Sequence, residues 1–315
     1  MKRMLVTLVV VAGLAWCGPV CAKAPLTLML DWFPNVDHLP VYVAQQRGFF
    51  SQEGLTVDIL NPSDTADGLK LAAAGKVDLA VSYEPQTLMA AGRGIDVRVV
   101  GRLIGHPLTT LMFLKSSGIT KPADLSGRTI GYTVPGLMDV LMDAFAGVNG
   151  ITDYRLVNVG VSIAPALSAG RVDAVMGPFK TYETVTLAAE GLDTGFFELE
   201  KWGIPEYDEL IFICGPRTLA DRRRQVLGFV RAVARGIDLI AESPDAALAD
   251  YFKALPDADR KVESEAFALT RPYYAAQQTC DPAAWQKFAD FALKHGLIEE
   301  PVAVDALLTD LASGR

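Results

Sequence analysis

The sequence has few of the residues that build metal centres. Its 315 residues include only three histidines, His38, His106 and His295, and four cysteines. The histidines are far apart in the sequence and no cysteine cluster accompanies them, so the ligand spacing of a zinc site is absent. The sequence therefore predicts no metal centre and no cofactor.

The common catalytic and nucleotide-binding motifs are also absent. The Gly75-Lys76 pair is not followed by the Ser or Thr of a phosphate-binding loop, and no dinucleotide fingerprint follows an apolar run. The segment around Ser162 only half matches a nucleophile elbow. Acidic residues outnumber basic ones, 37 to 29, and the net charge is −8. These absences predict no catalytic residue, and the acidic balance argues against a nucleic-acid partner.

Only the N-terminus carries a long apolar run. Residues 5–16 are apolar, follow a basic start at Lys2 and Arg3, and are too short to span a bilayer. Small residues suited to a cleavage site follow at 22–24. We predict that residues 1–24 are a signal peptide cleaved after Ala24, which makes the mature protein soluble and periplasmic. An uncleaved anchor is the alternative.

The cysteines bear on lipidation and on disulfide formation. Cys17 and Cys21 do not lie in a lipobox-like context, so simple secretion is preferred to a lipoprotein. Cys214 and Cys280 remain after cleavage, in a compartment that permits a disulfide. Cys214 lies in an apolar run and is expected to be a buried thiol, which leaves the bridge open.

From residue 26 onward, short apolar runs alternate with helical segments. This alternation, with 50% hydrophobic residues, predicts an α/β fold with mixed sheets flanked by helices. A helix is expected at Thr65–Ala74. The predicted strands are Leu26–Leu30, Thr56–Leu60, Leu79–Ser82, Val97–Gly101 and Thr110–Lys115.

Two segments repeat one another. Residues 71–78 read LAAAGKVD and residues 167–173 read LSAGRVD, and each precedes an apolar strand. Each is a helix end, a glycine stop, a basic residue and an Asp that enters the strand. We interpret them as one αβ unit used twice, and the alternative is a chance match of a common junction.

The chain is expected to form two lobes. We place the crossing into a second lobe at the polar segment Lys115–Gly118, and the return near Gly203–Tyr207. The first lobe then comprises residues 25–115 and 208–315, and the second comprises residues 116–207. Amphipathic periodicity predicts helices on the outside of the first lobe at Arg222–Ala241, Asp245–Ala254 and Pro282–His295.

The segment 29–55 holds the first group of candidate site residues, which are Asp31, Trp32, Asn35 and His38. A strand precedes them, and a helix follows that we expect to be capped by Asp37 and ended by Gly48. Ligands of open α/β sheets bind at this strand end. Core packing of Trp32 and a buried, hydrogen-bonded His38 are the structural alternatives.

A second group of candidates follows three other strands. Two strand exits carry Pro, Tyr and Glu, which would suit facing walls of one cleft. A third strand leads through a loop to the predicted helix Leu137–Gly147, whose free N–H groups could meet a ligand acceptor. Wall packing of the tyrosines and a capping role for Glu84 or Asp31 are the alternatives. The residues of this group are Ser82, Tyr83, Glu84, Tyr132, Pro135, Gly136, Tyr182 and Glu183.

Six segments in order resemble one known family. The chain is similar to the thiamine-pyrimidine (NMT1/THI5-like) family in DWFPNVDHLPVYVAQQRGFFSQEGL (31–55), AAGKVDLAVSYEPQT (73–87), LSGRTIGYTVPG (125–136), AGRVDAVMGPFKTYE (169–183), GIPEYDELIFICG (203–215) and AWQKFADFALKHGLI (284–298). The resemblance covers nearly the whole mature chain. It implies a two-lobe periplasmic binding protein fold of type II, with the ligand in a cleft between the lobes.

The resemblance also implies a function. We expect the solute-binding component of an ABC importer, a monomer that closes on its ligand and then docks on a permease in the inner membrane. The expected ligand is an aminopyrimidine precursor of thiamine, of the formylaminopyrimidine or hydroxymethylpyrimidine type. Aromatic side chains would face its ring, and by motif position Glu183 would bind its amino edge.

Several alternatives stay open. The family includes a pyrimidine-synthesis enzyme, but its Lys and His are matched here by Ser82 and Gln86, and its cysteine-rich run by Cys214 alone. The resemblance therefore favours a binder over an enzyme. Riboflavin, or a sulfonate, nitrate or taurine, could be the ligand instead. A sensor that signals to a membrane receptor is a further class.

Overall fold

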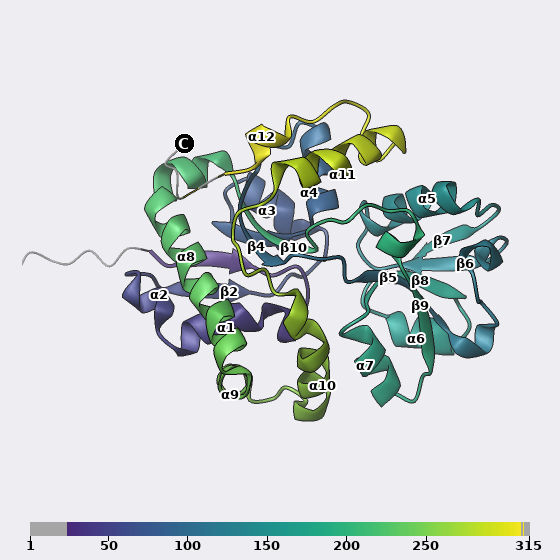
Figure 1. The fold of residues 1–315 in the computed structure, drawn as a ribbon, viewed down its shortest axis with the longest axis horizontal. Helices are drawn as coiled ribbons and strands as arrows, with labels where there is room; N and C mark the ends of the chain where they lie inside the picture. The colour runs from purple at the N-terminus through teal and green to yellow at the C-terminus, as the bar shows by residue number, and fades with distance from the viewer. Residues whose placement is uncertain (1–23, 310, 312–315) are drawn as a thin grey trace, which may run out of the picture.

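Two five-stranded sheets organise the chain in the computed structural model, which describes residues 24–309 and 311 (Figure 1). Residues 1–23 of the predicted signal peptide (residues 1–24) lie outside the described residues. The first sheet has the order β2-β1-β3-β10-β4. Its strands are β1 (Leu26–Met29), β2 (Val57–Leu60), β3 (Leu79–Ser82), β4 (Arg98–Ile104) and β10 (Leu210–Cys214).

The second sheet has the order β7-β6-β8-β5-β9. Its strands are β5 (Thr109–Leu114), β6 (Thr129–Tyr132), β7 (Arg155–Asn158), β8 (Ala174–Phe179) and β9 (Thr194–Glu198). In both sheets four strands run in the same direction. Three of them pair in parallel, and the fourth, β4 or β9, joins them across one antiparallel strand, β10 or β5. The expected α/β fold with mixed sheets is confirmed.

The two sheets share one topology, which explains the repeated sequence segments. Each repeat ends a helix at a glycine of positive φ, Gly75 in one and Gly170 in the other. The Asp that follows then accepts the backbone N–H of the neighbouring parallel strand. Asp78 accepts from Thr27 at 2.9 Å, and Asp173 accepts from Thr129 at 2.8 Å. The interpretation as one αβ unit used twice is therefore confirmed.

The assignment of strand 110–115 to the first lobe was wrong. β5 pairs with β8 and β9, so this strand belongs to the second sheet. The chain therefore crosses between β4 and β5, before Thr109, and it returns between β9 and β10. The polar residues 115–118 form the 3-10 turn η2 (Lys115–Ser117) at the far end of β5. The prediction failed because such a turn has the same polar, glycine-containing sequence as a linker between lobes.

A buried carboxylate joins the two crossing segments. Glu209 accepts the backbone N–H groups of Leu108 (2.5 Å) and Thr109 (2.7 Å), and the Thr109 hydroxyl at 2.7 Å. Burial raises the pKa of Glu209 to about 7. These bonds hold together the two segments that connect the sheets.

Helices cover the first sheet on both sides (Figure 1). Helix α1 packs on α8 and α9. Helix α3 packs on β3 and β10, and α11 packs on α4. The described helices of this lobe are η1 (Val36–His38), α1 (Leu39–Gln46), α2 (Phe49–Gln52), α3 (Asp67–Ala73), α4 (Glu84–Gly92), α8 (Pro216–Glu242, kinked at Arg222), α9 (Pro244–Ala254), α10 (Arg260–Thr270), η5 (Arg271–Tyr273), α11 (Pro282–Lys294) and α12 (Val304–Leu307). Helix α10 was not predicted from the sequence, and it packs on η1 and on α7 of the other lobe.

The second lobe carries fewer helices. α5 and α6 pack on β8, and α7 packs on β8 and β9. The elements are η3 (Pro122–Leu125), α5 (Met138–Asn149), α6 (Ile163–Ser168), α7 (Glu183–Ala189) and η4 (Leu199–Trp202). Within the described residues, no helix has the length and apolar character needed to cross a membrane. Cys214 and Cys280 are free thiols, and burial raises the pKa of Cys214 to about 12.

Candidate functional site

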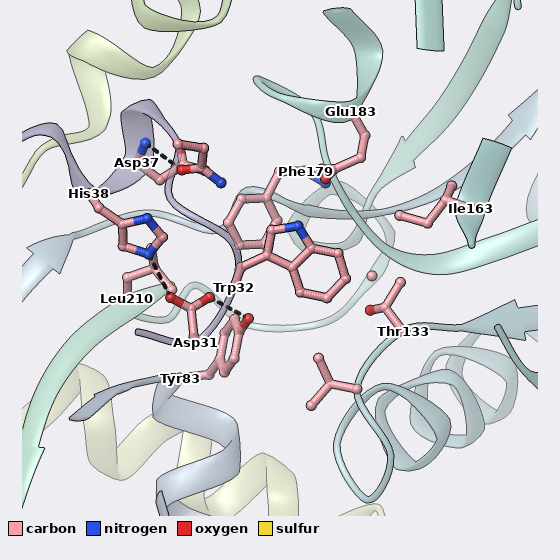
Figure 2. A pocket seen from close by; sticks show the side chains of 13 residues that line it. Asp31, Trp32, Asp37, His38, Tyr83, Thr133, Ile163, Phe179, Glu183 and Leu210 are labelled. Carbon is pink, nitrogen blue, oxygen red and sulfur yellow. Dashed lines mark hydrogen bonds and ion pairs between the residues drawn. The ribbon is translucent and has the colours of Figure 1, made fainter. Parts of the chain in front are cut away.

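A cavity lies between the two sheets, at the carboxyl ends of β1 and β3 in one and of β6 and β8 in the other (Figure 2). It encloses about 380 Å³ of space between atoms, part of it open to solvent. The lining residues are Asp31, Trp32, Asn35, Asp37, His38, Tyr83, Thr133, Val134, Ile163, Gly177, Phe179, Glu183 and Leu210.

Asp31 anchors the first-lobe wall of the cavity. Its carboxylate lies 2.9 Å from Nε2 of His38 and accepts the Tyr83 hydroxyl at 2.7 Å (Figure 2). All three side chains are buried. Nδ1 of His38 is buried and has no hydrogen-bond partner in the part of the chain that the structure describes. A buried polar atom without a partner is costly, so this nitrogen is a candidate contact for a ligand.

Asn35, rather than Asp37, caps the turn that follows. Oδ1 of Asn35 accepts the backbone N–H of Asp37 at 2.8 Å, and this bond begins η1. The predicted N-cap Asp37 instead turns inward, where it accepts the Thr270 hydroxyl at 3.2 Å and lines the cavity. Burial raises the pKa of Asp37 to about 8. At neutral pH this carboxyl therefore holds a proton and can donate a hydrogen bond.

Glu183 supplies the carboxylate of the opposite wall. It is the first residue of α7, and its Oε2 accepts the backbone N–H of Phe179 at 2.6 Å. The side chain is buried, and desolvation raises the pKa of Glu183 to about 7. A carboxylate with a pKa so near neutrality ionises readily when a donor reaches it.

Trp32 and the second lobe enclose the rest of the cavity. The indole lies in the middle of the cavity, with Ile163 and Thr133 on its second-lobe side (Figure 2). Gly177 has a φ of +126°, and a Cβ there would lie 2.0 Å from Oγ1 of Thr133. Only glycine therefore allows these two strand ends to approach so closely.

Six of the twelve predicted site residues line the cavity, namely Asp31, Trp32, Asn35, His38, Tyr83 and Glu183. Ser82 and Glu84 do not. The Ser82 hydroxyl donates to Gln86 at 2.9 Å, and Glu84 accepts the backbone N–H of Asp208 at 2.7 Å. At the exit of β3 the tyrosine thus faces the cavity, whereas at the exit of β8 the glutamate does.

The other four predicted residues also lie outside the cavity lining. Tyr132 packs on the hydrophobic core, and the Tyr182 hydroxyl donates to Glu263 at 2.9 Å. Pro135 is half-buried and Gly136 is exposed. Their neighbours Thr133 and Val134 line the cavity instead, so the predicted loop contributes to the site but through its first two residues.

Seven lining residues were not predicted from the sequence. Asp37 was predicted to be a helix cap, although its position between the candidate site residues Asn35 and His38 also indicated a place in the site. The others are mostly apolar and carry no chemical signature in the sequence. They are Thr133, Val134, Ile163, Gly177, Phe179 and Leu210.

The cavity lining contains no Lys or Arg. The basic residue nearest in sequence, Lys180, is held elsewhere by Glu198 (2.8 Å) and Glu200 (2.9 Å). Among the described residues, no group of three or more His, Cys, Asp or Glu side chains is placed to hold a metal ion. The site therefore offers carboxyls, an amide, an imidazole and aromatic faces.

Replacing Asp37 by Asn should stabilise the unliganded protein at pH 8 but not at pH 4. Because the pKa of Asp37 is raised from 3.8 to about 8, the folded state keeps this proton while the unfolded state loses it, so stability falls as the pH rises between these values. Asn cannot ionise. We expect a gain of about 2 kcal/mol or more at pH 8, since each unit of pKa shift corresponds to about 1.4 kcal/mol.

Chemical denaturation of both proteins at pH 4 and pH 8 measures this difference. The exposed carboxylate of Asp58 provides a matched control, and Asp58→Asn should alter the pH dependence little. If the free energies of unfolding of Asp37→Asn and wild type differ by the same amount at pH 4 and pH 8, Asp37 does not have the raised pKa.

Two mixed sheets with a cavity between them, at the carboxyl ends of their parallel strands, define the periplasmic binding protein fold. The alkanesulfonate-binding protein of Xanthomonas axonopodis pv. citri, solved with bound MOPS, superposes with a TM-score of 0.73. It is 17% identical, and the match covers 91% of this chain and 98% of that one. At this identity the similarity shows the fold alone.

The chain belongs to the family described as NMT1/THI5 like, whose profile matches residues 35–247. A Haemophilus influenzae protein named for thiamine biosynthesis is 36% identical over 96% of this chain and 98% of its own length. A formylaminopyrimidine-binding protein from Halalkalibacterium halodurans is 31% identical over 90% of this chain and 89% of its own length. The resemblance noted from the sequence is confirmed.

The family also contains proteins named as enzymes. A 4-amino-5-hydroxymethyl-2-methylpyrimidine phosphate synthase from Legionella pneumophila is 29% identical over 91% of this chain and 92% of its own length. Family membership alone therefore does not separate a binder from a synthase.

Proposed function

We propose that this chain is the periplasmic solute-binding component of an ABC importer for an aminopyrimidine precursor of thiamine, of the formylaminopyrimidine or hydroxymethylpyrimidine type. The observation that carries the proposal is the cavity between the lobes, which combines an aromatic face with buried carboxyls and contains no Lys or Arg. The relative named as formylaminopyrimidine-binding supports the ligand class.

The polar groups suit the edges of an aminopyrimidine. The exocyclic amino group is a donor, and Glu183 is the carboxylate proposed to accept from it. The ring nitrogens are acceptors, and the amide of Asn35 and the protonated carboxyl of Asp37 are available as donors. Nδ1 of His38, which lacks a partner among the described residues, can meet one further polar atom.

The apolar groups suit the faces of the same ring. The indole of Trp32 provides a flat surface in the middle of the cavity, and Ile163 and Phe179 bound the space beside it. Aromatic rings stack favourably at this kind of surface. A flat, amino-bearing heterocycle therefore matches both the shape and the polarity of the lining.

An anionic ligand fits less well. Bringing a sulfonate, nitrate or phosphate beside Glu183 would place like charges together, and the lining has no Lys or Arg to compensate. A flavin has a larger ring system than a pyrimidine and would need a wider flat slot between the two walls. Both remain outcomes of the binding test below.

We prefer the function of a solute-binding protein to that of a pyrimidine synthase. The positions of the family's Lys and His are occupied here by Ser82 and Gln86, which hydrogen-bond to each other at 2.9 Å and do not line the cavity. We propose that closure of the two lobes about the segment held by Glu209 captures the ligand and presents a closed form to the permease. The protein would act as a monomer.

The proposal is tested by native mass spectrometry of the purified protein, followed by calorimetry. Formylaminopyrimidine, hydroxymethylpyrimidine, riboflavin and taurine are titrated separately. Micromolar or tighter binding of a pyrimidine, and no binding of taurine, is the expected result. Preferred binding of riboflavin or taurine would overturn the ligand, and cofactor-dependent turnover of the pyrimidine would overturn the function.

A further inference from the structure

Glu263 lies outside the cavity yet contacts both of its walls. It projects from α10, the helix that packs on both η1 and α7, and its side chain is 5% exposed. Figure 1 shows α10 and α7 side by side where the two lobes meet. Neither Glu263 nor its second-lobe partner Tyr182 lines the cavity.

One oxygen of Glu263 holds the first-lobe wall. Oε2 accepts the backbone N–H of Val36 at 3.0 Å and the hydroxyl of Tyr251 at 3.0 Å. Val36 begins η1, whose other two residues, Asp37 and His38, both line the cavity. The position of these two side chains thus depends on this carboxylate.

The other oxygen reaches across to the second lobe. Oε1 accepts the hydroxyl of Tyr182 at 2.9 Å. Tyr182 immediately precedes Glu183, the carboxylate of the opposite wall. Because its donor and acceptor belong to different lobes, this bond exists only while the lobes are together, and water replaces it when they part.

We propose that the Tyr182–Glu263 hydrogen bond is a closure latch, in which Glu263 is a positioning residue that ties the arrangement of η1 to the closed position of α7. This inference rests on the proposed function, since a latch matters only if the lobes open and close on a ligand. It acts on the closed state without touching the ligand. Its loss therefore speeds opening and ligand release and leaves association nearly unchanged.

The test compares Tyr182→Phe with wild type by stopped-flow binding of formylaminopyrimidine and by hydrogen exchange of the unliganded proteins. We expect the dissociation rate to rise five- to thirtyfold, the association rate to stay within about twofold, and the amides of α7 and α10 to exchange faster. These magnitudes follow from the loss of one hydrogen bond to a charged group. Tyr154→Phe is the matched control, because that hydroxyl donates to Asp143 within the second lobe.

Unchanged dissociation and exchange in Tyr182→Phe would overturn the latch. If the Tyr182 hydroxyl contacted the ligand directly, its removal would change the rate of ligand release but not the hydrogen exchange of the free protein. Altered release with unaltered exchange would therefore also overturn the latch. If wild type does not bind formylaminopyrimidine, the proposed ligand fails, and the exchange comparison alone decides the latch. Glu263→Gln is the second variant, and its effect should be less than additive with that of Tyr182→Phe.

Discussion

Replacing Glu183 by Gln should weaken binding of the aminopyrimidine at least thirtyfold. A hydrogen bond from a ligand amino group to a buried carboxylate contributes about 2 kcal/mol, and about 1.4 kcal/mol corresponds to a tenfold change in affinity. Gln keeps the volume of the side chain and the oxygen that accepts the Phe179 N–H, so the wall should keep its shape. Calorimetric titration of formylaminopyrimidine into both proteins measures the change.

The chain itself offers the control for this experiment. Glu84 is also the first residue of a helix that follows a parallel strand, is also buried, and also accepts a backbone N–H, that of Asp208. It does not line the cavity. Glu84→Gln should therefore leave the affinity within about threefold of wild type. Equal losses in the two variants, or no loss in Glu183→Gln, would remove Glu183 from the ligand contacts.

Much of the fold could be predicted because its signals are local. Strand Leu79–Ser82 was predicted with the bounds it has, and the glycine, basic residue and Asp of the repeated segments marked the two αβ units. The assignment of β5 to the first sheet failed because strand partners are set by the whole chain. Nothing in the residues 109–114 distinguishes the sheet that they join.

The site was predicted in part for a related reason. Polar and aromatic residues after a strand, such as Asp31 and Trp32, stand out in the sequence. Which neighbour faces the cavity depends on local geometry. Of two adjacent candidates, Tyr83 lines the cavity, whereas the side chain of Glu84 turns away. The role of Glu263 could not be predicted, because the residues that it joins are 227 and 81 positions away in the chain.

Replacing Trp32 by Ala should cost more binding than any other single change in the first-lobe wall, about 2 to 3 kcal/mol, which is roughly 30- to 150-fold. The indole provides the flat face in the middle of the cavity, and its removal loses both buried apolar area and the stacking of rings. Trp32→Phe keeps a smaller aromatic face and should lose about 1 kcal/mol. Calorimetry with formylaminopyrimidine gives both values.

Phe33 distinguishes a ligand contact from general packing at this loop. Its ring meets that of Trp32 edge to face, with centroids 6.0 Å apart, but its side chain is 53% exposed and does not line the cavity. Phe33→Ala should therefore leave the affinity within about threefold. If Phe33→Ala and Trp32→Ala weaken binding equally, the indole only orders the loop. If the affinity instead falls from wild type to Trp32→Phe to Trp32→Ala, and Phe33→Ala leaves it unchanged, the ring of the ligand lies on the indole. A flat heterocycle is then what the cavity between the lobes is built to hold.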